Sequence, residues 1–132
     1  MRIVDKSLGG LNWPSYTLFV NNANKVALSF RPNNTQTNQQ IVQSQTTLQK
    51  GKWYFIATTL GNGTLKIYVN GVLNGTNTNI GNYTPYNNNN PIFIGAAPST
   101  SGTTSNHFIG ALSDIRIHNR MLNSTEIKDI YE

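Results

Sequence analysis

The strongest indication of the fold is the stretch GKWYFIATTLGNGTLKIYVNG, from Gly51 to Gly71. Two strand-like runs, residues 53–59 and 65–69, flank a short segment whose Gly and Asn residues accept the positive φ angles of a tight turn. In the second run apolar and polar side chains alternate, as expected when one strand face is buried and the other meets water. The stretch therefore predicts an antiparallel β-hairpin.

The first run of this hairpin is apolar on both faces, with Trp53 and Phe55 in one alternating set and Ile56 in the other. This pattern is typical of a strand that is covered on both sides, and it assigns Trp53 to the core. The second run ends at Asn70-Gly71, the dipeptide that best fits a two-residue turn. We therefore expect a third adjacent strand over residues 72–74.

Length and composition favour one soluble module over residues 1–132. Charged residues make up only 11% of the chain, so Asn, Thr, Ser and Gln supply most of its polarity, and these residues favour turns and strand faces over long helices. The absence of Cys excludes disulfides and thiolate metal sites. Since no apolar run approaches the roughly 20 residues of a membrane span, we expect no membrane insertion.

The formal net charge of +5 raises the question of an anionic partner. The basic residues are scattered along the chain; Lys50 and Lys52 are close together, but no stacking motif accompanies them. This distribution is typical of a solvated surface, and it does not predict a nucleic-acid partner.

Short runs with strand-like alternation recur along the whole chain, with turns rich in Asn and Gly between them. They cover residues 16–20, 25–30, 41–42, 92–94 and 107–118, and residues 1–6 are expected to add a short edge strand. This spacing predicts an all-β, antiparallel sandwich of two sheets.

The C-terminal residues 123–132 change to a helical period. Asn123 followed by Glu126 is the pattern of a capping box, and Ile127, Ile130 and Tyr131 share one helical face. We expect one short C-terminal helix that packs on the sandwich.

Several pieces of the chain, in this order, resemble the laminin-G-like branch of the concanavalin A-like lectin/glucanase superfamily. They are GKW at 51–53, LKIYVNG at 65–71, IFIG at 92–95, FIGALSDIRI at 108–117 and NRMLN at 119–123. The resemblance implies a jelly-roll sandwich of two antiparallel sheets. It also implies an extracellular module, or one at a cell or virion surface, whose partner is a glycan or a surface protein.

Members of that family usually begin with a further strand pair before the equivalent of Ile3 and Val4. A missing pair would leave an open sheet edge or an uncovered core face. We therefore expect either that residues 1–6 cover the gap or that two chains form a homo-oligomer across it. Ser113 stands where the family often has an acid, which weakens the case for a calcium site that depends on that acid.

Acidic residues are too few for the usual catalysis of this superfamily. The chain has Asp5, Asp114, Glu126, Asp129 and Glu132, three of them in the terminal helix. Glycoside hydrolysis needs two carboxyl groups flanking the bond, so we predict that the module is not an enzyme. No cofactor or metal site is predicted. A structural calcium ion stays open as an alternative, although calcium needs several oxygen ligands including carboxylates.

Glycan binding calls for an aromatic ring that covers a sugar face, with amides and hydroxyls for the sugar's OH groups. The candidate ligand-binding residues are Trp13, Tyr83, Tyr86, Asn87, Asn88 and His107. In the alternative interpretation Trp13 and Tyr86 pack back onto the sandwich, and the Asn run is a solvated loop.

The pattern as a whole favours a non-catalytic, lectin-like recognition module that binds carbohydrate. The alternative is a structural or adhesive appendage of a larger surface or virion protein, with no sugar site of its own. A glycosidase-related fragment is the third hypothesis.

Overall fold

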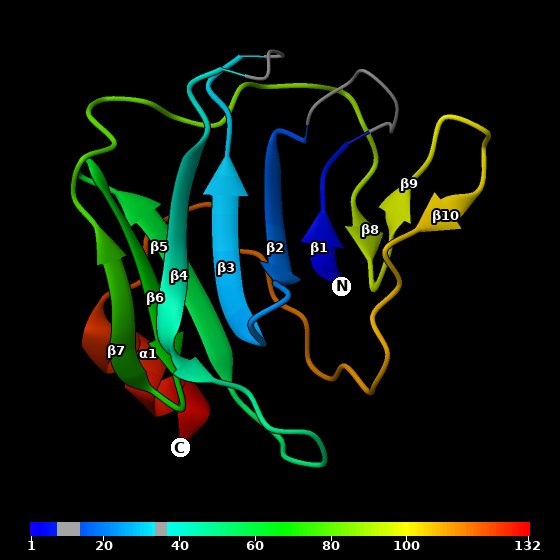
Figure 1. Ribbon diagram of the computed structural model, residues 1–132. Coiled ribbons are helices and arrows are strands. Elements are labelled where there is room, and N and C mark those ends of the chain that lie inside the picture. The colour runs from blue at the N-terminus through cyan, green and yellow to red at the C-terminus, as the bar shows by residue number, and fades with distance from the viewer. Residues whose placement is uncertain (8–13, 34–36) are drawn as a thin grey trace.

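The computed structural model describes residues 1–7, 14–33 and 37–132, and it shows two antiparallel sheets stacked face to face (Figure 1). We call the sheet of order β4-β3-β2-β1-β8 the N-terminal sheet and the sheet of order β5-β6-β7 the hairpin sheet. A further short pair joins β9 to β10. The strands are β1 (Arg2–Asp5), β2 (Tyr16–Val20), β3 (Lys25–Phe30), β4 (Gln40–Thr47), β5 (Ile56–Gly61), β6 (Thr64–Val69), β7 (Val72–Asn77), β8 (Phe93–Ile94), β9 (Ala97–Pro98) and β10 (Thr104–Ser105).

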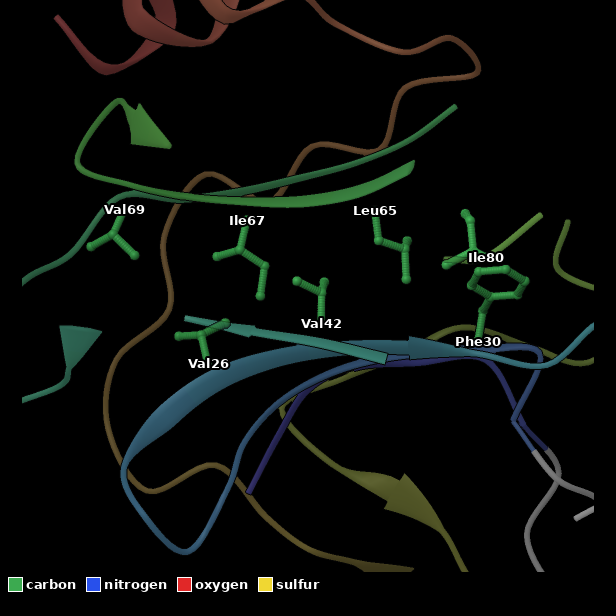
Figure 2. Packing of buried hydrophobic residues seen from close by; sticks show 7 residues of the cluster. All are labelled: Val26, Phe30, Val42, Leu65, Ile67, Val69 and Ile80. Carbon is green, nitrogen blue, oxygen red and sulfur yellow. The ribbon is translucent and has the colours of Figure 1, made fainter. Parts of the chain in front are cut away.

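One helix, α1 (Ser124–Tyr131), packs on the face of the hairpin sheet that points away from the N-terminal sheet (Figures 1 and 2). Its Tyr131 ring lies 5.6 Å, between centroids, from the ring of Phe55. The prediction of an all-β antiparallel jelly-roll sandwich with one short C-terminal helix is confirmed.

Tight turns of the expected kind join the strands of the hairpin sheet. Asn62 and Gly63 both have positive φ, of 51° and 68°, and so do Asn70 and Gly71, of 52° and 76°. Positive φ at both central residues is the mark of the turn whose twist matches that of paired strands. The hairpin predicted from this stretch, and the third strand after it, are confirmed.

The core lies between the two sheets. Val26, Phe30 and Val42 point from the N-terminal sheet toward the hairpin sheet, and side chains of β6 point back at them (Figure 2). Because β6 alternates, one face supplies this core while Lys66 takes the opposite face. The full cluster is Val26, Phe30, Val42, Leu65, Ile67, Val69 and Ile80.

The expectation that residues 53–59 form a strand covered on both faces is wrong. β5 begins only at Ile56 and is an edge strand of the hairpin sheet, and Trp53 is 69% exposed instead of buried in the core. The pairing ends at Phe55, whose N–H donates to Asn70 Oδ1 at 3.0 Å and whose carbonyl accepts the Asn70 N–H at 2.8 Å. Because the chain leaves the sheet before Phe55, Trp53 lies in solvent.

The expected long strand over residues 107–118 is also wrong. This part of the chain forms no strand, and Ile109 is 85% exposed. Asp114 has a φ of 52°, in the left-handed region, which interrupts the alternation of side chains that a strand requires. Its carboxylate binds the guanidinium of Arg116 through two hydrogen bonds, of 2.9 and 2.8 Å.

The N-terminal residues form an inner strand, in contrast to the expected edge strand. β1 pairs with β2 on one side and with β8 on the other, so that Asp5 lies between Thr17 and Phe93. This placement brings the side chains of β1 into the middle of the N-terminal sheet.

The predicted capping box starts α1. Asn123 Oδ1 accepts the Glu126 N–H at 2.9 Å, and Glu126 Oε2 accepts the Asn123 N–H at 2.8 Å. The Arg120 guanidinium donates to both oxygens of the same carboxylate, with its Nη2 2.7 Å from Oε1 and its Nη1 3.1 Å from Oε2. Ile127 is buried below this cap and anchors the helix.

We expect this cap to make stability depend on acid pH. The hydrogen bonds from Arg120, and then the one from the Asn123 N–H, lower the pKa of Glu126 from 4.5 to about 2. Because the folded pKa is the lower one, the carboxylate stabilises the fold above about pH 4.5, and this contribution is lost as the pH falls toward 2. Glu126→Gln should therefore lower the melting temperature near pH 6 and have little effect near pH 2.

Thermal melts of both proteins across this pH range test the prediction. Glu132→Gln is the matched control, because the Glu132 carboxylate forms an exposed ion pair with Lys128, at 3.6 Å. A constant gap in melting temperature between wild type and Glu126→Gln at every pH would contradict a role for the ionised carboxylate.

Candidate functional site

A groove of about 360 Å³ lies on the outer face of the N-terminal sheet, the face away from the core. Its wall includes side chains that can donate or accept hydrogen bonds and one aromatic ring. We call it the outer groove and define it by Arg2, Thr17, Phe19, Ser29, Arg31 and Gln39.

Strand alternation places these side chains on one face. In β3, Val26 and Phe30 point into the core, so Ser29 faces outward. The register sets Thr17 of β2 opposite Ser29, and Phe19 of β2 opposite Arg2 of β1. Polar and aromatic side chains therefore share the outer face of three neighbouring strands, β1, β2 and β3.

Three contacts hold Arg2 in place. Its Nη1 donates to Thr17 Oγ1 at 3.0 Å, its Nε lies 3.4 Å from Asp5 Oδ2, and its guanidinium carbon lies 5.0 Å from the centroid of the Phe19 ring. Asp5 is almost fully buried and also accepts a hydrogen bond from Ser7 Oγ. A cation over an aromatic face is favourable, so these contacts preorganise the Arg2 side chain.

Arg31 is only 6% exposed at the end of β3, and it lines the same groove. Its Nη2 donates to Gln39 Oε1 at 3.0 Å. Burial lowers the pKa of Arg31, and the positive charge of Arg2 lowers it further, whereas Tyr86 raises it. An arginine stays protonated at neutral pH even so, and two neighbouring cations therefore line the groove.

Ser29 contributes a buried hydroxyl to the wall. The residue is 1% exposed, and its Oγ has no hydrogen-bond partner among the residues that the structure describes. Leaving such a group unsatisfied costs about 1–3 kcal/mol, so its presence calls for an explanation.

The loop with most of the sequence-predicted residues is tied to the N-terminal sheet. The Tyr86 N–H donates to the carbonyl of Arg31 at 3.0 Å, and Ser15 Oγ donates to the Tyr86 carbonyl at 2.7 Å. Further along, Lys6 Nζ donates to the Asn90 carbonyl at 2.8 Å. These contacts put Tyr86 beside the outer groove, where it influences the pKa of Arg31.

The other predicted residues have different surroundings. Tyr83 and Asn87 are exposed, and Asn88 is half-buried with its Oδ1 accepting the Asn90 N–H at 3.1 Å. Trp13 lies outside the described residues.

His107 is exposed, and its Nε2 lies 2.8 Å from Thr104 Oγ1 beside β10. It follows Asn106, a groove-lining residue whose carbonyl accepts the Arg2 N–H at 2.8 Å. His107 thus lies next in sequence to the wall of the outer groove, while its ring is bonded to the neighbouring hairpin.

The sequence pattern did not predict the residues that line the groove itself. A signal was present, because Thr17, Phe19 and Ser29 occupy the positions of residues 16–20 and 25–30 that alternate with the buried ones. Only the pairing of β1 beside β2, however, brings Arg2 to the same face.

The chemistry of the groove is that of recognition by hydrogen bonds and positive charge. None of its described lining residues is an Asp, Glu or His. Nor do three or more His, Cys, Asp or Glu side chains gather anywhere in the described part of the chain to hold a metal ion. Within the described ranges no helix has the length and apolar character needed to cross a membrane.

Two stacked antiparallel sheets with a polar groove on one outer face define a β-sandwich of the jelly-roll class. A laminin-G family model of the Concanavalin A-like lectin/glucanases superfamily matches residues 1–128. The chain belongs to this superfamily, as the resemblance in its sequence indicated. No curated protein matches the chain at a significant level.

Solved structures of low sequence identity share this fold. The carbohydrate-binding module CBM40 of the Ruminococcus gnavus IT-sialidase, bound to α2,3 sialyllactose, superposes with a TM-score of 0.76 at 16% identity, over 99% of this chain and 73% of that one. A heptameric SAP-like pentraxin from Limulus polyphemus gives 0.69 at 16% identity, over 99% and 62%.

A third similar structure is an S-layer domain-containing protein from Clostridium thermocellum. Its TM-score is 0.51 at 22% identity, and the match covers 100% of this chain. The chain spans 63% of that structure's length.

Proposed function

We propose that residues 1–132 act as a single, non-catalytic module that binds carbohydrate through the outer groove. The observation that carries this proposal is the combination in one groove of an aromatic ring, Phe19, with the hydrogen-bonding groups of Thr17, Ser29 and Gln39. Sugars present OH groups around a partly apolar ring, and such a wall complements both features.

The size of the groove suits this ligand class. Its volume of about 360 Å³ falls within the range of about 300–1,000 Å³ usual for small-ligand sites. The fold supports the same proposal, because a carbohydrate-binding module with this architecture has been solved with a sialylated oligosaccharide. We infer that the module works at a cell or virion surface or in the extracellular space.

The proposal assigns binding and no hydrolysis to this groove. Glycoside hydrolysis needs two carboxyl groups about 5–10 Å apart across the bond, and the described wall carries none. Four of the five acids form ion pairs within the protein, as Asp114 does with Arg116 and Glu126 with Arg120. We therefore expect no new reducing ends when the protein is incubated with soluble β-glucans.

A glycan array followed by titration calorimetry tests the proposed function. We expect reproducible binding to a subset of glycans and at least a tenfold loss of affinity in Tyr86→Ala, because Tyr86 lies beside Arg31 at the groove. The matched control is Trp53→Ala, which removes an exposed aromatic ring outside the groove and should bind as wild type does.

Absence of any glycan binding at high protein concentration would overturn the proposal. That result would favour a structural or adhesive appendage of a larger surface protein. Equal losses in Tyr86→Ala and Trp53→Ala would instead show that the bound face is not the outer groove.

A further inference from the structure

We propose that the outer groove selects sugars that carry a carboxylate, and that Arg2 and Arg31 hold this carboxylate while Ser29 donates a hydrogen bond to the same ligand. This inference rests on the proposed function and specifies its ligand class. It depends on three features of the groove: two neighbouring guanidinium groups, one buried hydroxyl and no carboxylate among the described lining residues.

The Nη2 group of Arg2 is available to donate hydrogen bonds to a ligand. A guanidinium carries five N–H donors in a rigid fork. Contacts within the described residues use its Nε, toward Asp5, and its Nη1, toward Thr17. Its guanidinium carbon lies 5.0 Å from the centroid of the Phe19 ring, and this contact and the two polar ones hold the side chain, so Nη2 can meet an anion with little loss of side-chain entropy.

Arg31 adds the second positive charge from deeper in the wall. Its side chain is 6% exposed and is oriented by Gln39 at 3.0 Å. Burial lowers the pKa of Arg31, and the charge of Arg2 lowers it further because the two cations repel each other. An anion placed between them would relieve this repulsion in the bound state.

Ser29 is an independent sign of a polar ligand. Its side chain is 1% exposed, it lines the groove from β3, and its Oγ has no partner in the described part of the chain. A buried hydroxyl without a partner destabilises the folded protein, and a ligand oxygen within reach would remove that penalty.

Together these groups match a flat anion attached to a sugar. Arginine forks bind planar carboxylates through two parallel hydrogen bonds, and these charge-assisted bonds are stronger than neutral ones. The wall around them offers the Ser29 hydroxyl and the Gln39 amide for the OH groups of the sugar. Sialic acids and uronic acids share this chemistry.

Titration calorimetry with matched ligands tests the inference. The probes are sialyllactose, its methyl ester, lactose, a sulfated lactose, and lactose that carries a terminal glucuronic acid. We expect sialyllactose or the glucuronic acid probe to bind at least tenfold tighter than lactose, and we expect the methyl ester to lose this advantage. Raising the salt concentration should weaken the acidic ligand more than lactose.

Two variants locate the carboxylate. Arg31→Lys keeps the charge but removes the fork, so we expect at least a tenfold loss for the acidic sugar and little change for lactose. Ser29→Ala should also weaken the acidic sugar, by about threefold or more, while its melting temperature stays equal to that of wild type or rises, because a buried unsatisfied hydroxyl is removed. Weaker binding without any loss of stability cannot arise from damage to the fold.

The outcomes separate this inference from the proposed function. Equal binding of lactose and both acidic sugars would overturn the carboxylate inference and leave carbohydrate binding intact. Tighter binding of sulfated lactose than of either carboxylate would replace the ligand class by sulfated sugars. An acidic-sugar affinity unchanged in both Arg31→Lys and Ser29→Ala would place the site elsewhere, and no binding to any probe would overturn both proposals.

Discussion

Phe30→Ala is expected to lower the free energy of unfolding by about 3–5 kcal/mol, the usual cost of removing a buried aromatic ring. Phe30 is 1% exposed and lies between the sheets beside Ile80, at one end of the core (Figure 2). The truncation would leave a cavity that the paired strands on either side cannot fill. Urea denaturation followed by circular dichroism measures the effect.

The matched control is Trp53→Ala, which removes a larger aromatic ring that is 69% exposed. Surface substitutions usually change stability by no more than about 0.5 kcal/mol, and we expect that here. A loss of several kcal/mol in Trp53→Ala would mean that Trp53 is buried after all, as the sequence pattern alone had indicated.

Gly75→Ala is expected to cost about 2–3 kcal/mol, which is toward the upper end for overpacking. Gly75 lies in β7 where this strand faces β4, and a Cβ atom there would meet the backbone carbonyl oxygen of Gln43. Strand β7 is held to β4 at this point, since Asn74 Oδ1 accepts the Thr46 N–H at 2.9 Å. The steric clash of the added Cβ can therefore be relieved only if two strands shift.

Gly61→Ala is the control for this prediction. A Cβ at Gly61 would approach Met121 Sδ at 2.6 Å, but the Met121 side chain is flexible and 42% exposed, so it can move aside. Neither glycine has a left-handed φ, and the comparison therefore isolates steric contact from backbone strain. Equal melting temperatures for the two variants would show that β7 and β4 do not approach so closely.

The incorrect prediction of a strand over residues 107–118 has a local cause. Apolar residues recur there at strand-like spacing, yet Asp114 adopts a left-handed φ of 52° and binds Arg116. An alternating pattern shows which residues could share a face, but it does not show whether a neighbouring strand is present to pair with. For the same reason, the alternating pattern wrongly placed Trp53 in the core: Trp53 precedes the first residue pair between β5 and β6.

The candidate site was predictable only in part. Tyr86 was predicted as a binding residue because it lies in an Asn-rich loop. In the structure, hydrogen bonds to Ser15 and Arg31 hold that loop against the N-terminal sheet. The outer groove itself was not predicted, because Arg2 and Arg31 are far apart along the chain and neither belongs to a recognisable motif.

The local features of this protein were predictable from its sequence: the two turns at Asn62-Gly63 and Asn70-Gly71, the alternation that buries one face of β6, and the capping box of α1. Each depends on residues near one another in the chain, whose conformational preferences act before any long-range contact forms. Which strands became neighbours, and where the outer groove formed, depended on long-range contacts. Strand order depends on contacts between distant segments, and here the insertion of β1 between β2 and β8 brings Arg2 to the face that carries Ser29.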